Sequence, residues 1–168
     1  KKKIRPVNRL DKDTSGIVIF AKNEYIQECL IKQMKKKSFV KEYIAICEGN
    51  FENRSGIINK PISRKENSII ERCVNENGDI AVTHYDLIKN NNDYSILHCT
   101  LETGRTHQIR VHLAYIGHPI VGDTLYGNKS VKITRQALHA YKVSFNHPIT
   151  KQKVEYVAKI PHEIEALM

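Results

Sequence analysis

The chain is read outward from the stretch Asn8-Arg9-Leu10-Asp11-Lys12-Asp13-Thr14-Ser15-Gly16 and the apolar run Ile17-Val18-Ile19-Phe20-Ala21 behind it. The polar part combines two carboxylates, an arginine, two hydroxyls and a glycine, and the apolar part predicts a buried strand. Polar groups at the end of a strand commonly form a site, because a packed scaffold fixes their positions. The alternative is an ordinary polar loop in which Thr14-Ser15-Gly16 supplies the turn.

Hydrophobic periodicity predicts helices in three places. Asn23 is a candidate N-cap for a helix whose apolar stripe is Ile26, Leu30, Ile31 and Met34. Thr106 is a candidate N-cap for a second helix that runs to Ile116. Pro161 suits the first turn of a short terminal helix.

Alternation and turn residues predict the strands. Residues 39–47 predict a strand that is buried on both faces, because apolar side chains occupy both of them. A hairpin is expected from residues 81–88 and 94–101 across the turn at 90–93. Residues 54–60, 68–74, 138–145 and 154–160 complete the set. With no internal repeat or linker, the chain is expected to be one α+β domain with a mixed, largely antiparallel sheet and flanking helices.

Composition narrows the class of protein. The chain has 168 residues, and 27 Lys and Arg against 18 Asp and Glu give a formal net charge of +9. Such a surface favours a polyanionic partner, nucleic acid before acidic membrane. No apolar run approaches the roughly 20 residues of a membrane span, and Lys1-Lys2-Lys3 lacks a signal-peptide core behind it. The scattered cysteines (Cys29, Cys47, Cys73 and Cys99) indicate buried reduced thiols and a cytoplasmic protein.

The histidines do not predict a metal site. His107, His112 and His118 lack the i, i+4 spacing of a helical zinc site, so we expect no metal site. The chain also lacks a serine-hydrolase elbow, a P-loop and a dinucleotide fingerprint.

Asp11 and Asp13 are the candidate reactive acids. As a pair they resemble the carboxylates of a glycosidase, although the facing geometry of such a pair does not follow from the sequence. Alternatively, Arg105 at the mouth of the second helix forks onto Asp11 and keeps this carboxylate ionised. The alternative is that Asp11 and Arg105 form an ion pair with a purely structural role.

Five motifs, in order and spacing, resemble the RluA family of pseudouridine synthases. They are Arg9-Leu10-Asp11-x-x-Thr14-Ser15-Gly16; Lys41-Glu42-Tyr43; Gly104-Arg105-Thr106-His107-Gln108-Ile109-Arg110-Val111-His112; Gly117-His118-Pro119-Ile120-Val121-Gly122-Asp123-x-x-Tyr126-Gly127; and Leu138-His139-Ala140 with His147-Pro148. The resemblance extends over residues 5–161. It implies a sheet that is split by a cleft, and an enzyme that modifies RNA without a metal or a cofactor.

The resemblance also implies roles for single residues. Asp11 matches the catalytic aspartate, Tyr43 the active-site tyrosine beside the base, and Arg105 the arginine that pairs with the aspartate. Arg9 matches an arginine that can fill the space of a flipped nucleotide. The other motif positions expected to contact RNA are Thr14, His107, Gln108, Arg110 and His112.

These expectations amount to a monomeric pseudouridine synthase acting on structured RNA, with large-subunit ribosomal RNA before transfer RNA. Asn8 stands where the family commonly has His, a change we expect to be tolerated. Family members carry a further catalytic segment, and often an RNA-binding S4 domain, ahead of the first motif. Residues 1–168 are therefore expected to be one catalytic domain from the C-terminal part of a longer chain. The alternatives are a non-catalytic RNA-binding module and a glycoside hydrolase that uses Asp11 and Asp13.

Overall fold

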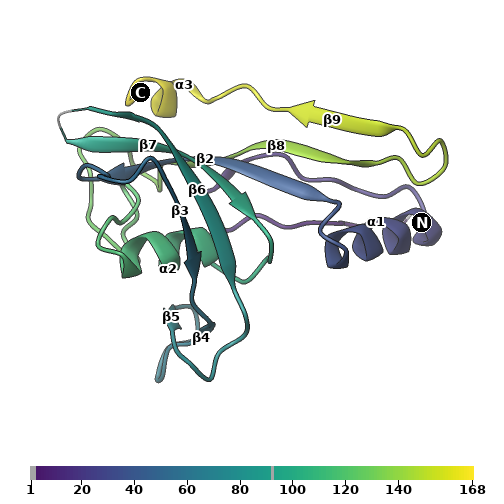
Figure 1. Ribbon diagram of the computed structural model, residues 1–168, viewed down its shortest axis with the longest axis horizontal. Helices are drawn as coiled ribbons and strands as arrows, with labels where there is room; N and C mark the ends of the chain where they lie inside the picture. Colours follow the sequence, from purple (N-terminus) through teal and green to yellow (C-terminus); the bar gives the residue numbers. More distant parts are fainter. Residues whose placement is uncertain (1–2, 92) are drawn as a thin grey trace.

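The strand β2 (Val40–Glu48) lies at the centre of the fold. The computed structural model describes residues 3–91 and 93–168, and its seven-stranded sheet has the order β1-β8-β2-β7-β6-β3, with β9 paired to β8 (Figure 1). Tyr43, Ile44, Ala45, Ile46 and Cys47 of β2 are all buried, which confirms a strand covered on both faces. Within the described sheet only the β1–β8 pairing is parallel, so the prediction of a mixed, largely antiparallel α+β fold is confirmed.

The other strands follow the predicted pattern closely. The hairpin of β6 (Val82–Asn90) and β7 (Tyr94–Leu101) is confirmed, although Asn92 in its turn lies outside the described residues. The final pair of strands, β8 (Leu138–Asn146) and β9 (Lys153–Val157), is also confirmed. β3 (Ser55–Asn59) forms an edge of the sheet. β4 (Ile62–Arg64), which periodicity did not predict, pairs with β5 (Arg72–Val74) in a separate two-stranded sheet.

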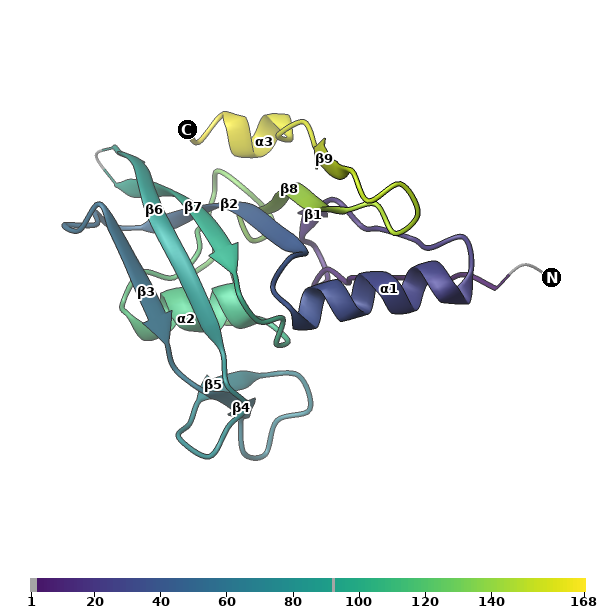
Figure 2. The same ribbon diagram turned by 45° about the vertical axis from the view of Figure 1, so that its right-hand side comes forward.

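Three helices are present in the described residues. Asn23 caps α1 (Glu24–Lys35) as predicted, because its side-chain oxygen accepts a hydrogen bond from the Ile26 amide at 2.9 Å. α3 (His162–Glu165) follows Pro161. α2 (Gln108–Tyr115) begins later than expected: its N-cap is His107, with φ 59°, and not Thr106. Both α1 and α2 lie on one side of the strands, opposite α3 (Figures 1 and 2).

The apolar run at residues 17–21 does not form the buried strand that the sequence predicts. β1 contains only Ser15–Gly16. Beyond it the chain forms an isolated antiparallel bridge with residues 5–7, in which the Val7 amide donates to the Ile19 carbonyl at 2.8 Å. The Asn8 side chain adds two bonds: its Nδ2 donates to the Ile17 carbonyl at 3.0 Å, and its Oδ1 accepts from the Ile19 amide at 2.7 Å. A side chain thus satisfies two backbone groups that a longer ladder would pair, and Phe20 is 57% exposed.

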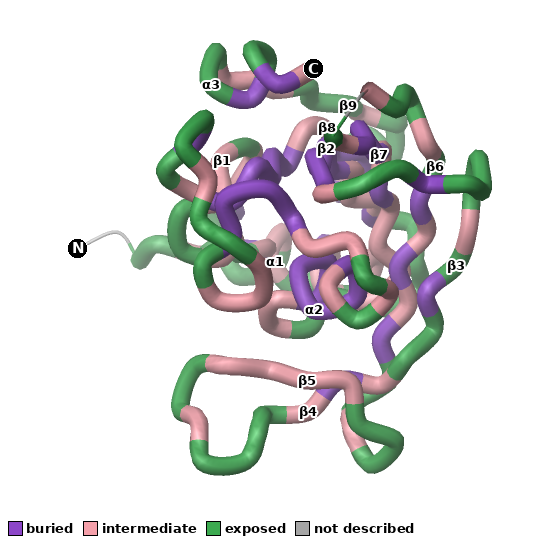
Figure 3. Tube along the Cα trace, turned by 90° about the vertical axis from the view of Figure 1, so that its left-hand side faces the viewer, coloured by how far each residue is buried: buried purple, intermediate pink, exposed green. Residues whose placement is uncertain are grey.

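The core is organised around β2 and α2. Its largest cluster joins β2 and β7 to Ile109 and Leu113 of α2 and to Ile164 of α3. Figure 3 shows the buried positions concentrated there, whereas β4 and β5 are largely half-buried or exposed. The four cysteines are free thiols; Cys47 and Cys99 are buried as expected, but Cys29 and Cys73 are only half-buried.

Gly16 is the tightest point of the β1–β8 contact. Its φ is +120°, and a Cβ at this position would lie 2.2 Å from the Ala140 carbonyl oxygen. Gly117 is the matched control, since its φ is +87° but a Cβ there would meet nothing within 4 Å. Gly117→Ala should cost about 1 kcal/mol of unfolding free energy from backbone strain alone. Gly16→Ala should cost at least about 2 kcal/mol, because the collision adds to the strain. Urea titration measures both, and equal effects would contradict the close approach.

Candidate active site

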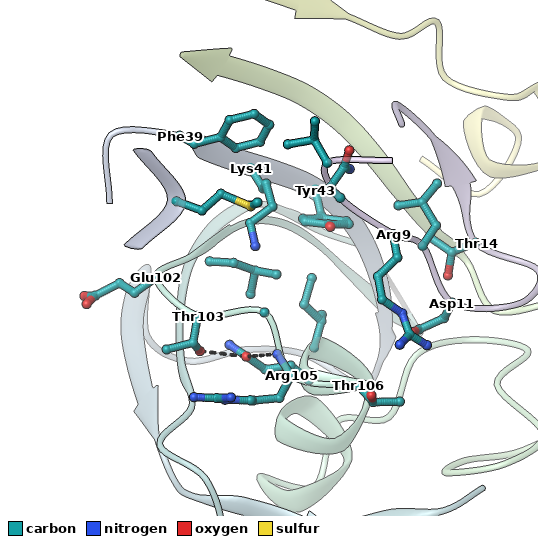
Figure 4. A pocket seen from close by; sticks show the side chains of 18 of the residues that line it. Arg9, Asp11, Thr14, Phe39, Lys41, Tyr43, Glu102, Thr103, Arg105 and Thr106 are labelled. Carbon is teal, nitrogen blue, oxygen red and sulfur yellow. Dashed lines mark hydrogen bonds between the residues drawn. The ribbon is translucent and has the colours of Figure 1, made fainter. Parts of the chain in front are cut away.

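A pocket of about 690 Å³ opens between the Asp11 loop, the end of α1, the start of β2 and the segment before α2 (Figure 4). Its apolar wall includes Leu10, Met34, Phe39, Leu101 and Ile109. This is the concave, mostly apolar surface with a few polar groups that is typical of ligand sites.

Asp11 is one of the two carboxylates that line this pocket, the other being Glu102. Its side chain is 17% exposed, and its Oδ2 lies 3.8 Å from Nη1 of Arg110. Asp13, two residues further on, is exposed, has φ 67° and does not line the pocket. The structure therefore separates the two candidate acids by position.

Arg110 is held by Asp123, a residue for which the sequence predicted no role. Nε of Arg110 donates to Asp123 Oδ2 at 2.7 Å and Nη2 donates to Oδ1 at 2.9 Å. Asp123 is fully buried and also accepts hydrogen bonds from the amides of Leu125 and Tyr126. The fork fixes the plane of the guanidinium, so that its remaining nitrogen faces Asp11.

The predicted pairing of Arg105 with Asp11 is wrong. The Arg105 guanidinium donates to the Ile80 carbonyl at 3.0 Å, and it lies 3.5 Å from Asp79 with 42% of its side chain exposed. It precedes α2 and extends along the rim of the pocket, whereas Arg110, on the buried face of α2, reaches the aspartate.

Three predicted RNA contacts are buried within the protein. Gln108, Arg110 and His112 are at most 6% exposed. Gln108 accepts from the Thr103 hydroxyl and the Arg105 amide, and it donates to the Val82 carbonyl. The partners of these side chains lie inside the protein, although Gln108 also lines the pocket, so RNA contact by these three residues stays a prediction.

His112 has no contact with solvent. Its Nε2 donates to the Lys60 carbonyl at 2.9 Å, and its Nδ1 lies 2.9 Å from the Thr83 hydroxyl. Burial lowers the pKa of His112 below its ordinary value, although the bond to Lys60 opposes this. A neutral imidazole with one donor and one acceptor matches these partners.

The remaining predicted contacts lie near the pocket opening. Arg9 is exposed and lines the pocket, as does half-buried Thr14. His107 is half-buried outside the pocket lining, with its Nδ1 2.7 Å from the Tyr126 hydroxyl, which in turn accepts from the Arg72 amide at 2.8 Å.

The Asp11 loop is fixed by residues just before β8. Nε2 of Gln136, a buried side chain, donates to the Lys12 carbonyl at 2.6 Å and to the Thr14 hydroxyl at 3.1 Å. Arg135 donates to the Asp13 carbonyl at 3.0 Å and reaches back to Glu163 of α3 at 2.7 Å. Nothing in the spacing of these residues predicted this clamp.

Tyr43 and Lys41 face the pocket from alternate positions of β2. Burial, with Asp11 nearby, raises the pKa of the Tyr43 phenol far above its ordinary value, so the ring carries a neutral hydroxyl at physiological pH. The Lys41-Glu42-Tyr43 motif pointed to this strand, but only its tyrosine was expected to act.

No group of three or more His, Cys, Asp or Glu side chains in residues 3–91 and 93–168 is placed to hold a metal ion. Over the same residues, no helix has both the length and the apolar character needed to cross a membrane.

Two Asp–Arg pairs test how much burial matters. Asp123→Asn should cost about 3 kcal/mol of unfolding free energy, because it leaves a buried guanidinium without its full counter-charge. Asp79→Asn removes the carboxylate of the exposed Arg105 pair and should change stability by less than about 0.5 kcal/mol. Chemical denaturation of both variants makes the comparison. A small effect at Asp123 would mean that water reaches the Arg110 site.

Comparison with known proteins gives relatives of one kind. An RNA pseudouridine synthase of Bacillus subtilis (strain 168) named YhcT and described as uncharacterized is 45% identical over 167 residues, covering 98% of this chain and 55% of its own length. The ribosomal large subunit pseudouridine synthase D of Nitrosomonas europaea is 39% identical over 171 residues, covering 96% and 49%. The chain thus spans about half the length of these relatives.

The solved structures that this fold resembles are also pseudouridylate synthases. The structure of human RNA pseudouridylate synthase domain containing 1 superimposes with a TM-score of 0.80 at 26% identity, covering 94% of this chain and 69% of that one. The family model described as RNA pseudouridylate synthase matches residues 1–115. On this match the chain belongs to the RNA pseudouridylate synthase family.

Proposed function

We propose that this chain is the catalytic domain of an enzyme that isomerises uridine to pseudouridine in large-subunit ribosomal RNA, with Asp11 as its catalytic carboxylate. One observation carries the proposal: Asp11 is the partly open acid of a basic-rimmed pocket, aligned with Tyr43 and backed by Arg110. Family membership supports the reaction class. The relatives named ribosomal large subunit pseudouridine synthase D support the choice of RNA.

The pocket suits a nucleotide taken out of its stack. A uridine in structured RNA must be extruded before its glycosidic bond can be reached, at a cost of a few kcal/mol. The wall of Leu10, Phe39 and Ile109 excludes water around an extruded ring, and Tyr43 offers an aromatic surface with a neutral hydroxyl.

Asp11 supplies negative charge at the sugar. When the N1–C1′ bond breaks, C1′ acquires positive character, which a carboxylate stabilises either by attack or by its charge. The Arg110 guanidinium faces this carboxylate at 3.8 Å, too far for a hydrogen bond, so the oxygens of Asp11 stay free. Released and turned, the ring rejoins the sugar through C5, and the hydrogen on C5 is lost to solvent.

The pocket rim supplies contacts for the RNA backbone. Arg9, Lys35, Lys37 and Arg105 are exposed side chains that line it. Exposed cations bind phosphate without reading the base, so they hold the strand while the pocket selects the nucleotide.

The glycoside hydrolase alternative has little geometric support. The pocket's second acid is Glu102 and not Asp13, and Glu102 is bound by Lys37 and by His84, the latter at 2.5 Å. A facing pair of carboxylates around a sugar is therefore not formed by the two acids that the sequence suggested.

Asp11→Asn should abolish pseudouridine formation while RNA still binds, because removing a negative charge does not weaken attraction to phosphate. Asp13→Asn, the matched change in the same loop, should keep substantial turnover and lose at most about 1 kcal/mol of stability. The assay is tritium release from C5-labelled uridine in ribosomal RNA by the intact protein. Normal turnover by Asp11→Asn would favour the non-catalytic RNA-binding module instead.

RNA affinity should fall linearly on a logarithmic salt scale, because bound phosphates release counterions. Arg105→Gln should lower the steepness of this line by about 0.7, the value for one phosphate contact on single-stranded RNA. Arg54→Gln removes an exposed charge outside the pocket lining and should leave the slope unchanged. Filter binding over a salt series measures both, and an unchanged slope in Arg105→Gln would remove this residue from the RNA contact.

A further inference from the structure

Lys41 differs from every other cation at the pocket. Its side chain is half-buried and points into the open centre of the cavity (Figure 4). Among the described residues no carboxylate lies within salt-bridge distance of its ammonium: Glu102 is taken by Lys37 and His84, and Glu42 by His98 and Lys142.

The surroundings of Lys41 disfavour its charge. Burial lowers the pKa of its ammonium, and no neighbouring acid opposes this effect. An unpaired cation in an apolar pocket costs stability unless a ligand or a reaction uses it. Gly104 packs closely beside it, since a Cβ at that position would stand 3.0 Å from Nζ. The fold thus reserves space for an uncompensated positive charge.

The position of this charge selects its target. Asp11, Tyr43 and Lys41 follow one another in the pocket, with Tyr43 between the other two on the β2 side. If Asp11 faces the sugar and the extruded ring lies against Tyr43, Lys41 faces the far edge of the ring, where a uracil carries carbonyl oxygen. In this arrangement the phosphates would lie at the rim, where Arg9, Lys35 and Arg105 are exposed.

We propose that Lys41 is a catalytic residue that stabilises the uracil anion released when the N1–C1′ bond breaks, an inference that rests on the proposed function. The bonding pair of that bond passes to N1 and is delocalised onto the ring carbonyl oxygens, one of which accepts a hydrogen bond from Nζ. The pair at C5 then forms the C5–C1′ bond, the C5 proton goes to solvent, and N1 takes up a proton. Atoms and charge balance without a further reactant.

Such a contact acts on the rate and not on binding. Bound uridine is neutral, whereas the released ring is anionic, so the ammonium interacts more strongly with the reaction's charged state than with the substrate. A phosphate anchor would behave in the opposite way, because a phosphate is equally charged throughout.

The test compares Lys41→Met and Lys41→Gln in the intact protein, by single-turnover tritium release at saturating protein and by RNA affinity. We expect the rate constant to fall about 100-fold in both, the scale of losing one preorganised charge contact. The dissociation constant should change less than about threefold, and the salt slope should stay at its wild-type value. The urea midpoint of Lys41→Met should equal or exceed that of the wild type, because an unpaired buried charge is removed.

Lys142→Met is the control, since it deletes one positive charge on the neighbouring strand β8 outside the pocket lining, and it should keep the wild-type rate. Lys35→Met, at the rim, should instead raise the dissociation constant. The inference is overturned if Lys41→Met or Lys41→Gln reacts at the wild-type rate, or if either variant loses only affinity. A wild-type protein that releases no tritium would refute the proposed function itself, and the inference with it.

Discussion

The site depends on the buried ion pair between Arg110 and Asp123. Desolvating both charges is costly, and a well-packed apolar pair could serve stability equally well. Here every oxygen of Asp123 is satisfied, by Nε and Nη2 of Arg110 and by the amides of Leu125 and Tyr126. What the pair adds is orientation. A guanidinium anchored along one edge has one nitrogen left, and this nitrogen points to Asp11.

Around this pair the structure joins segments that are distant in sequence. Tyr126 lies under the Arg110 guanidinium, 5.1 Å from its central carbon, and its hydroxyl links His107 to the backbone of β5. On the other side of Asp11, Gln136 and Arg135 hold the loop from more than a hundred residues away. The geometry of the candidate site is therefore a product of the complete fold, and no single motif contains it.

This explains what the sequence could and could not predict. Strands β2, β6, β7 and β8 and helix α1 follow from periodicity and capping, which are local properties. The choice between Arg105 and Arg110 as the partner of Asp11 depends on the rotation of α2 against the sheet, which no local pattern determines. The same rotation buries His112 and Gln108, two residues whose place in the motif suggested an RNA contact.

The apolar run at residues 17–21 shows a different limit of prediction from sequence. Periodicity describes side-chain burial but not which groups pair with the backbone. At residues 17–19 the partners are the Asn8 side chain, the Ala140 carbonyl and the Val7 amide. Asn8, where this chain departs from the motif that it resembles, therefore has a structural role. An asparagine can donate to one backbone group and accept from another at once, and this closes the base of the Asp11 loop.

Charge is distributed in the candidate site so that Asp11 and Lys41 keep free hydrogen-bonding capacity. If Arg110 forked onto Asp11 at 2.7–2.9 Å, as it does onto Asp123, the carboxylate would be fully engaged and a poorer nucleophile. The distance of 3.8 Å leaves the charge of Asp11 supported while its oxygens remain available. Asp123 thus spares Asp11, and the absence of an acid beside Lys41 within the described residues leaves that ammonium equally available. Asp123 has its oxygens fully engaged, whereas the opposite charges of Asp11 and Lys41 stay incompletely paired, on either side of the place where a uracil ring would lie.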